Sequence, residues 1–313
     1  MFPIRLIPEK PNLKFMKRRW FAFTLSGAAM LGTIVLLLVR GLNLGIDFTG
    51  GVVIEARLPQ AVELGSIRHT LGNLELGDIT LQNFGSERDL LIRLPKQQGG
   101  SEVQNAAIAK IKEALGEGVE YRKIDQVGPQ VGDELKYGAV LATLLSFAAI
   151  MVYIWVRFEW QFGVGGLLAL VHDAMITVGF YAVTQIEFNL TSVAAVLTII
   201  GYSVNDSVVI YDRIRENLRR YKKMPISELL DISLNETLSR TTMTVFTTLL
   251  ALLALILLGG DVIRGFCLAM FFGIVWGTYS SIYISAPVLI YLNLRSTTGD
   301  APALPLKAAK AKA

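Results

Sequence analysis

A few ionisable side chains stand inside long apolar stretches of this sequence, where charged residues are rare. They are Asp206, Arg240 and Asp173, the last of which directly follows His172. A charge at the centre of a bilayer costs about 2.5–3.5 kcal/mol on insertion scales, so such a residue usually has a functional role. Carboxyl and imidazole groups in that setting commonly relay protons. The residue types therefore predict ion movement across a membrane, with H+ as the first candidate and Na+ as the alternative.

Asp206 belongs to a polar stripe on an otherwise apolar segment. The helical period places four polar residues on one face: Thr198, Tyr202, Asn205 and Asp206. Arg240 opens the next apolar run and shares a face with Thr244. Consecutive spans run antiparallel, so Asp206 and Arg240 are expected at similar depth, where protonation of the aspartate would break an ion pair. Two alternatives stay open: an interfacial aspartate satisfied by water, and an arginine that reaches the membrane surface.

His172 and Asp173 form a second polar pair inside the third apolar run. A titrating role for this pair is a weaker hypothesis than for Asp206. The alternative is a structural one, in which both side chains make hydrogen bonds between helices.

The sequence offers little for covalent catalysis or for a resident cofactor. It has one cysteine and two histidines, all far apart, which argues against a structural metal site. The glycine-rich segment Gly45–Gly51 (GIDFTGG) lacks the spacing of a phosphate-binding loop and the Lys-Ser/Thr that would follow it. We therefore predict no enzyme activity, no metal, no cofactor and no nucleic-acid partner.

The elements that must position these residues are membrane helices. Hydrophobic residues make up 52% of the 313 residues and charged residues only 18%, and the apolar residues fall into long blocks. We predict six spans in a polytopic α-helical membrane protein, at 20–39, 138–156, 162–184, 190–210, 240–258 and 266–292. Lys and Arg gather in 1–19, in an amphipathic segment at 211–239 and in a disordered tail at 293–313, which places both termini in the cytoplasm.

Residues 40–137 form the one sizeable polar region, between the first two spans. Strand and helix patterns alternate there in the order βαββαβ, which predicts a small α+β domain of the ferredoxin-like type on the periplasmic side. Gly45, Asp47, Gly50 and Gly51 lie at its start and are interpreted as a hinge between the first span and this domain.

The sixth span carries a small residue at every fourth position. The series is Gly265, Ala269, Gly273, Gly277 and Ser281. Small residues at this period let helix backbones approach closely, so we predict a packing face.

Five segments together resemble the SecD/SecF family of protein-export membrane proteins, on its SecF side, within the resistance–nodulation–division superfamily. They are Gly45–Gly51 (GIDFTGG), Leu170–Asp173 (LVHD), Gly201–Asn217 (GYSVNDSVVIYDRIREN), Leu238–Thr242 (LSRTT) and Gly277–Tyr283 (GTYSSIY). The block at 201–217 is the most specific of them. The polar domain and the tail match only in general pattern.

The resemblance implies a six-span half of a pseudo-symmetric twelve-span unit, with SecD as the other half, in the bacterial inner membrane. It implies association with the SecYEG translocon, with YajC and YidC as further partners, and contact with an unfolded polypeptide in transit. It also implies use of the proton-motive force in late stages of protein export. In that family, residues matching Asp206 and Arg240 are implicated in ion conduction.

Two other functions remain as alternatives. One is a proton-coupled exporter of small hydrophobic molecules from the same superfamily, against which the small polar domain and the six spans argue. The other is a membrane scaffold that conducts nothing, against which the intramembrane charges argue.

Overall fold

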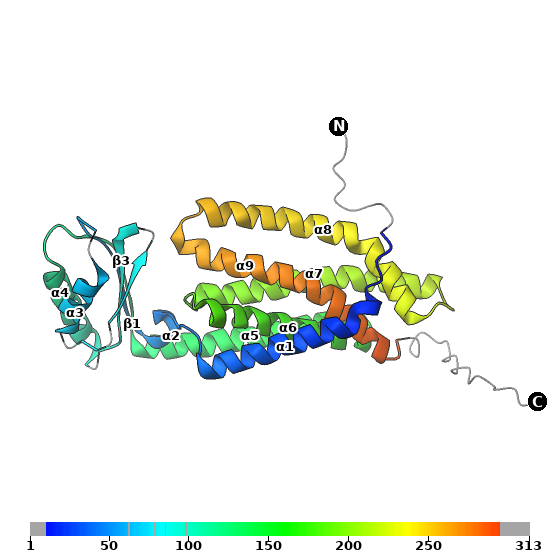
Figure 1. Cartoon of the computed structure of the whole chain (residues 1–313). Helices are drawn as coiled ribbons and strands as arrows, with labels where there is room; N and C mark the ends of the chain where they lie inside the picture. The colour runs from blue at the N-terminus through cyan, green and yellow to red at the C-terminus, as the bar shows by residue number, and fades with distance from the viewer. Residues whose placement is uncertain are drawn as a thin grey trace, which may run out of the picture.

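The computed structural model describes residues 11–294 except 62, 75, 78, 85 and 98. Residues 1–10 of the predicted N-terminal segment 1–19, and residues 295–313 of the predicted tail 293–313, lie outside the described residues. Figure 1 shows a bundle of long helices with a small sheet domain at one end. The long helices are α1 (Arg19–Val39), α5 (Pro129–Arg157), α6 (Trp160–Thr184), α7 (Leu190–Arg220), α8 (Ile226–Leu258) and α9 (Asp261–Ser280). The start of α1 and the end of the last short helical turn lie at the end of the bundle opposite the sheet.

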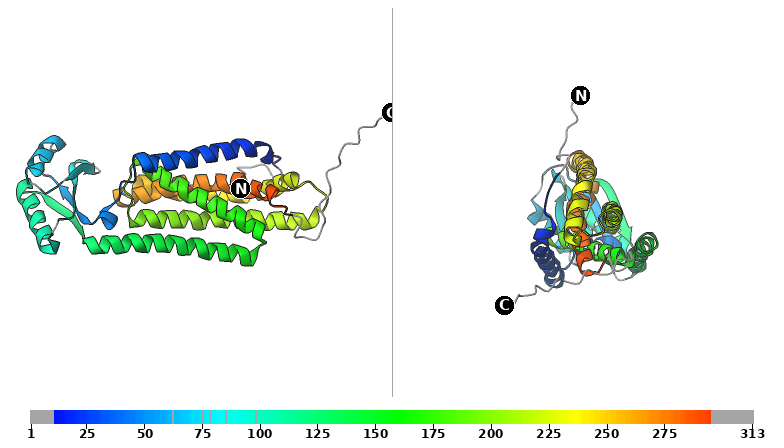
Figure 2. Two further views of the ribbon diagram at one scale, coloured as in Figure 1. Left: turned by 90° about the horizontal axis from the view of Figure 1, so that it is seen from below. Right: turned by 90° about the vertical axis from the view of Figure 1, so that its right-hand side faces the viewer.

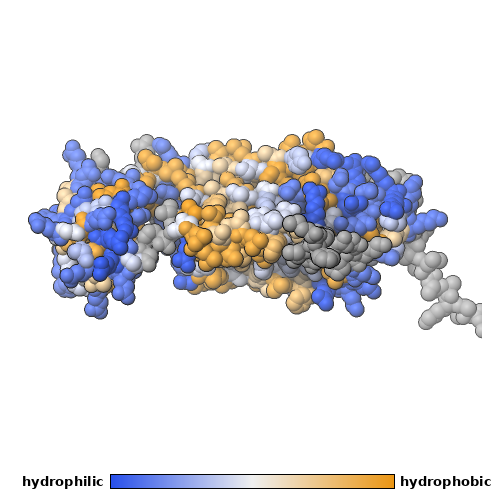
Figure 3. Space-filling view, turned by 90° about the horizontal axis from the view of Figure 1, so that it is seen from above, coloured by the Kyte–Doolittle hydropathy of each residue, from blue (hydrophilic) through white to orange (hydrophobic). Residues whose placement is uncertain are grey.

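Six helices are long and apolar enough to cross a membrane, which confirms the predicted fold class. On the face drawn in Figure 3, apolar residues dominate the middle of the bundle, and hydrophilic surfaces lie at both ends of the molecule. The sixth span is not one uniform helix. After α9 it continues through a π-helical turn, η2 (Ser281–Ser285), then α10 (Ala286–Val288) and the 3-10 turn η3 (Leu289–Tyr291).

The fourth and fifth helices are longer than the predicted spans. α7 continues to Arg220, ten residues past the predicted end at 210, and α8 begins at Ile226 instead of 240. The prediction of a separate amphipathic segment over 211–239 is therefore wrong. Its apolar stripe packs on α7 instead of on lipid, since Leu229 and Leu230 are fully buried in one cluster with Ile214 and Leu218.

The polar domain is built around one antiparallel sheet. Its elements are β1 (Gly51–Arg57), α3 (Leu64–Gly72), β2 (Thr80–Phe84), β3 (Ser86–Leu94), α4 (Gly100–Leu115) and β4 (Glu120–Val127). The strand order is β2-β3-β1-β4, with β1 antiparallel to both β3 and β4. This is the arrangement predicted from the βαββαβ pattern.

The domain core lies between one sheet face and the helices α3 and α4. Alternate residues of β1, Val52, Ile54 and Ala56, are buried there against Leu71 and Ile111. Each fully buried large aliphatic side chain stabilises the domain by about 1.5–3 kcal/mol. The opposite sheet face is directed toward the helix bundle and carries charged residues that meet the α6–α7 loop.

The small-residue series on the sixth span lies against α7. A Cβ atom added at Gly273 would fall inside the side chain of Ile199, and one at Gly277 would meet Ser203 at 3.4 Å. Ser281 accepts a hydrogen bond from Ser207 at 3.3 Å. The close approach of α7 and η2 therefore depends on small side chains at these positions.

Candidate functional site

Helix α7 carries or contacts each group of the candidate site. Its first turn is closed by a capping box, in which the Asn189 side chain accepts from the Ser192 backbone N–H and the Ser192 hydroxyl accepts from the Asn189 N–H. Asp206 lies sixteen residues after Leu190, about 24 Å along the helix axis. That depth is within a hydrocarbon core of about 30 Å and nearer to the end opposite the sheet domain.

Asp206 faces a small cavity between α7 and α8. The cavity measures about 110 Å³, and its lining consists mainly of polar residues: Tyr202, Asn205, Asp206, Arg240, Thr241 and Thr244, with Val209 and Val245. The Thr241 hydroxyl donates to Asp206 Oδ1 at 2.6 Å. The Oδ2 atom is buried and accepts no hydrogen bond from any described residue. A carboxyl group with one hydrogen-bonded oxygen and one oxygen that lacks a hydrogen-bond partner is suited to taking up a proton.

Arg240 lines the same cavity but is not the group that contacts Asp206 directly. Arg240 is exposed, and no ion pair within 4.0 Å joins it to Asp206 in the described part of the chain. Thr241, one residue later and about 100° around the helix, faces α7 instead. Asp206, Asn205, Arg240 and Thr244 thus line one cavity, whereas the expected ion pair between Asp206 and Arg240 is not formed in the described structure.

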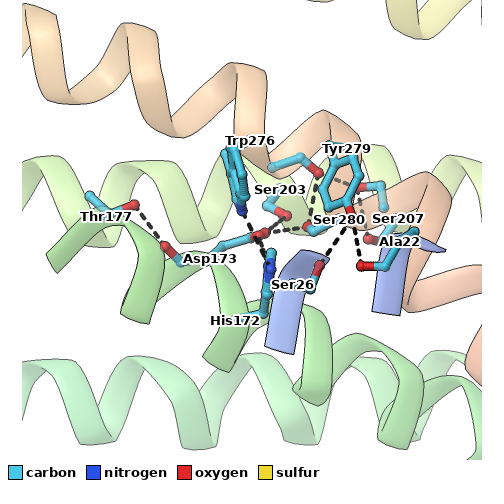
Figure 4. A network of polar contacts seen from close by, with 12 residues as sticks. Ala22, Ser26, His172, Asp173, Thr177, Ser203, Ser207, Trp276, Tyr279 and Ser280 are labelled. Atoms are coloured by element: carbon cyan, nitrogen blue, oxygen red, sulfur yellow. Dashed lines mark hydrogen bonds and ion pairs between the residues drawn. The ribbon is translucent and has the colours of Figure 1, made fainter. Parts of the chain in front are cut away.

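Asp173 lies in a separate and fully buried network (Figure 4). Its Oδ2 atom accepts from Ser203 of α7 at 2.5 Å and from Ser280 of α9 at 2.7 Å. Its Oδ1 atom lies 3.1 Å from His172 Nδ1, and Trp276 Nε1 donates to His172 Nε2 at 3.4 Å. Three helices therefore meet at one carboxyl group, and both of its oxygens are satisfied.

Ser203, the α7 residue that binds Asp173, precedes Asp206 by less than one turn of that helix. Ser203 binds Asp173, and Ser207, one turn further along α7, donates to Ser281. Ser281 is also a near neighbour of the Asp206 carboxyl. The π-helical turn that starts at Ser281 follows directly on Ser280. Ser280 thus binds the Asp173 carboxyl, and the next residue, Ser281, lies near the Asp206 carboxyl at the start of the π-helical turn. Such turns often occur at functional sites.

The first residues of α7 bind the polar domain. Asp47 Oδ2 accepts from the Leu190 backbone N–H at 2.9 Å, so a residue of the predicted hinge caps α7. Beside it, segment 43–45 pairs with the α6–α7 loop, where Phe188 N donates to Asn43 O at 2.8 Å and Gly45 N to Phe188 O at 2.9 Å. Arg93 of β3 forms an ion pair with Glu187. We call this set of contacts the α7 junction.

Glycines allow the junction to form. Gly50 and Gly51 have φ values of 69° and 122°, which side chains rarely adopt. A Cβ atom at Gly51 would lie 2.5 Å from the Leu94 carbonyl oxygen, and one at Gly45 would lie 2.5 Å from Glu187 Oε1. The segment 45–51 is therefore held against its neighbours. Its predicted role as a hinge stays a prediction.

Glu187 is the titratable group of the junction. Burial raises the pKa of its carboxyl group above the ordinary value, and the nearby Asp47 charge acts in the same direction. The Arg93 guanidinium opposes this shift by charge and by a hydrogen bond, and Lys123 opposes it more weakly. The cleft around it measures about 440 Å³ and also contains Glu55 and Asp125.

Sequence reasoning missed the residues that complete these groups. Thr241, Ser203 and Ser280 are small hydroxyl residues in apolar helices, and their helical phase relative to Asp206 and Asp173 was the available signal. Arg93 and Glu187 lie 94 positions apart, and no local pattern connects them. Among the described residues there is no group of three His, Cys, Asp or Glu side chains placed to hold a metal ion.

Comparison with known proteins identifies the family to which this chain is related. The profile described as "Protein export membrane protein SecD/SecF, C-terminal" matches residues 107–295, and the "SecD/SecF GG Motif" matches residues 35–62. The chain is 53% identical over 296 residues to the protein translocase subunit SecF of Rickettsia bellii strain OSU 85-389, covering 94% of this chain and 98% of that protein. It is 54% identical over 291 residues to SecF of Rickettsia conorii, covering 92% and 94%.

Solved structures agree with the sequence relatives. The crystal structure of SecDF from Thermus thermophilus, a translocon-associated membrane protein, matches with a TM-score of 0.83 at 36% identity over 93% of this chain. SecDF in a super-membrane-facing form matches with a TM-score of 0.66 at 37% identity over 95% of this chain. The chain spans 40% of the length of each of these SecDF proteins. Sequence and fold together show that the chain belongs to the SecD/SecF family of protein-export membrane proteins.

Proposed function

We propose that this chain is an auxiliary subunit of the Sec protein-export machinery that uses a proton gradient, together with SecD, to promote late stages of translocation. The observation that carries the proposal is the open, buried Oδ2 atom of Asp206 in a polar cavity inside the membrane. A proton bound there would neutralise the only carboxyl group of the described α7–α8 cavity. H+ is the proposed coupling ion, with Na+ as the alternative.

Protonation would act on the contact between α7 and α8. Ionised Asp206 attracts the Arg240 charge and accepts from Thr241. The neutral acid loses the attraction to Arg240, and the two helices can then shift relative to each other. A proton that crosses about 150–200 mV releases about 3.5–4.6 kcal/mol. That is enough to move a two-state equilibrium by a factor on the order of several hundred.

The shift would reach the polar domain through α7. The end of α7 that lies away from Asp206 is bound by Asp47 and by the pairing of segment 43–45, and Arg93 extends that contact to β3. The family fold exists in more than one arrangement, because two SecDF structures of nearly equal identity match this chain at TM-scores of 0.83 and 0.66. This supports a domain that changes position during the cycle.

We propose the orientation in the membrane from the distribution of Lys and Arg, and the partner proteins from the related sequences. Lys and Arg gather at the bundle end away from the sheet, so that end is proposed to face the cytoplasm and the sheet domain the periplasm of a bacterial inner membrane. SecD is the proposed partner for the other half of the unit, and SecYEG, YajC and YidC are proposed as further partners. The protein is proposed to act without covalent catalysis. The small-molecule exporter is less well supported, because the relatives are protein translocase subunits.

The test is ion flux in vesicles that contain this chain and its SecD partner under an imposed pH gradient. Asp206→Asn should abolish gradient-driven flux, because the amide cannot release a proton. Asp212→Asn is the matched control, since Asp212 lies on the same helix with a side chain 64% exposed and pairs with Arg157. Wild-type flux in Asp206→Asn would move the proton path elsewhere. Absence of flux in the wild type, with normal assembly, would favour the scaffold.

A further inference from the structure

The cytoplasm-facing end of the bundle, as oriented above, carries a basic pocket that the ion path does not use. It measures about 570 Å³ and lies between the end of α5 and the extension of α7. All six lining residues are charged: Arg157, Asp212, Arg215, Glu216, Arg219 and Arg220. Figure 2 shows that α7 continues past the end of α5, and Asp212, Glu216 and Arg219 are exposed on this extension.

Two of the arginines have no carboxylate partner in the described part of the chain. Three ion pairs account for the other charges: Arg157 with Asp212 (3.4 Å), Arg215 with Glu159 (3.7 Å) and Arg213 with Glu216 (2.9 Å). Arg219 is exposed, and the Arg220 guanidinium lies over the Tyr221 ring at 5.3 Å. The pocket therefore keeps two positive charges that neighbouring acids do not neutralise.

The pocket opens at the depth of the lipid headgroups. Helix α7 has 31 residues and is about 46 Å long, close to the full thickness of a bilayer with its headgroup layers. Trp155 and Trp160, on either side of the α5–α6 turn, are 56% and 53% exposed, as is usual for tryptophan at a membrane interface. Next to Arg157, the face of α5 that contains Val152 and Val156 is exposed and apolar, which suits acyl chains.

We propose that this pocket binds an anionic phospholipid with two phosphodiester groups, of the diphosphatidylglycerol type. Guanidinium groups bind phosphate oxygens in pairs of parallel hydrogen bonds, which ammonium groups do not. Two uncompensated arginines match the two negative charges of such a headgroup. Its acyl chains would lie along the exposed face of α5. The proposal does not depend on ion conduction by Asp206.

Native mass spectrometry of the full chain in neutral detergent tests the site, with tetraoleoyl diphosphatidylglycerol as the titrant. Replacing both arginines, Arg219→Ala with Arg220→Ala, should weaken binding about 30-fold. The matched control is Lys222→Ala with Lys223→Ala, which removes the same charge from the turn just outside the pocket. The control should weaken binding less than about threefold. Circular dichroism in lipid-free detergent checks that all variants are folded.

Further titrations distinguish a bound lipid headgroup from a soluble phosphate anion. Dioleoylphosphatidylglycerol, with one phosphodiester group, should bind more weakly than tetraoleoyl diphosphatidylglycerol, which has two, and phosphatidylcholine should not bind in the pocket. Replacing both arginines by lysine should keep the charge but lose part of the affinity, because lysine cannot bind a phosphate with two parallel bonds. Equal losses in the alanine and control variants would overturn the proposal in favour of diffuse attraction. Effective competition by inorganic pyrophosphate would overturn it in favour of a soluble anion.

Discussion

Asp47 should hold the first turn of α7 in place, and the substitution Asp47→Ala tests this. The carboxylate accepts from the Leu190 N–H at 2.9 Å and places a negative charge at the positive end of the helix dipole. Loss of a side-chain cap typically costs about 1 kcal/mol, and loss of the charge adds about 0.3–1 kcal/mol. We therefore expect the α7 junction to open more easily by about 1–2 kcal/mol, a factor of about 5–30.

Hydrogen exchange of backbone amides measures this opening directly. Leu190 N donates to Asp47, and Phe188 N and Gly45 N donate across the junction, so exchange should rise about 5- to 30-fold in peptides covering these residues. Asp47→Asn keeps an oxygen acceptor and loses only the charge, so its effect should be smaller. Asp133→Ala is the control, because Asp133 is 76% exposed and pairs only with Lys136 of its own helix.

The Asp47→Ala variant also distinguishes proton conduction from the coupling of conduction to export. Asp47 lies far from the Asp206 cavity, so the Asp47→Ala protein should still pass protons in vesicles while its stimulation of export falls. Unchanged exchange at Leu190 would refute the capping argument. An equal rise in the Asp133→Ala control would also refute it, because the effect would then be general destabilisation.

Two further predictions concern the junction and the helix packing. Burial raises the pKa of Glu187, so the docked state binds a proton more tightly than the undocked state. The α7 junction should therefore be most stable below the ordinary glutamate pKa, and its stability should fall as the pH rises through the raised pKa of Glu187. The substitution Glu187→Gln should remove this pH dependence. Hydrogen exchange of the backbone amides in segment 41–48 between about pH 5 and 8, corrected for intrinsic exchange rates, measures the effect. Gly273→Ala should lower the thermal midpoint more than Gly277→Ala, because its methyl group would collide with Ile199 while the other would only touch Ser203. Equal midpoints for the two alanine variants would contradict the packing of α9 on α7.

The sequence was sufficient for the fold class, and it singled out Asp206 and Asp173 as intramembrane carboxyl groups, but it did not identify the side chains that bind them. Hydropathy reports contact with lipid, so it located the spans but ended α7 at 210, where helix contacts replace lipid contacts. The sequence placed Arg240 at the depth of Asp206, and both line one cavity, but the side chain that hydrogen-bonds to Asp206 is that of Thr241. The pairing of Arg93 with Glu187 depends on how two domains dock, which no local pattern encodes.

The position of α7 is what would link the proposed proton uptake to the proposed movement of the polar domain. Its middle carries Asp206 and binds Asp173 through Ser203, and its first turn is held by Asp47. Close packing of Ile199 on Gly273 leaves this helix little freedom to bend, because interiors resist changes of even one methyl group. In the proposed cycle, a shift at Asp206 would therefore be transmitted along α7 to the α7 junction instead of being absorbed by the helix.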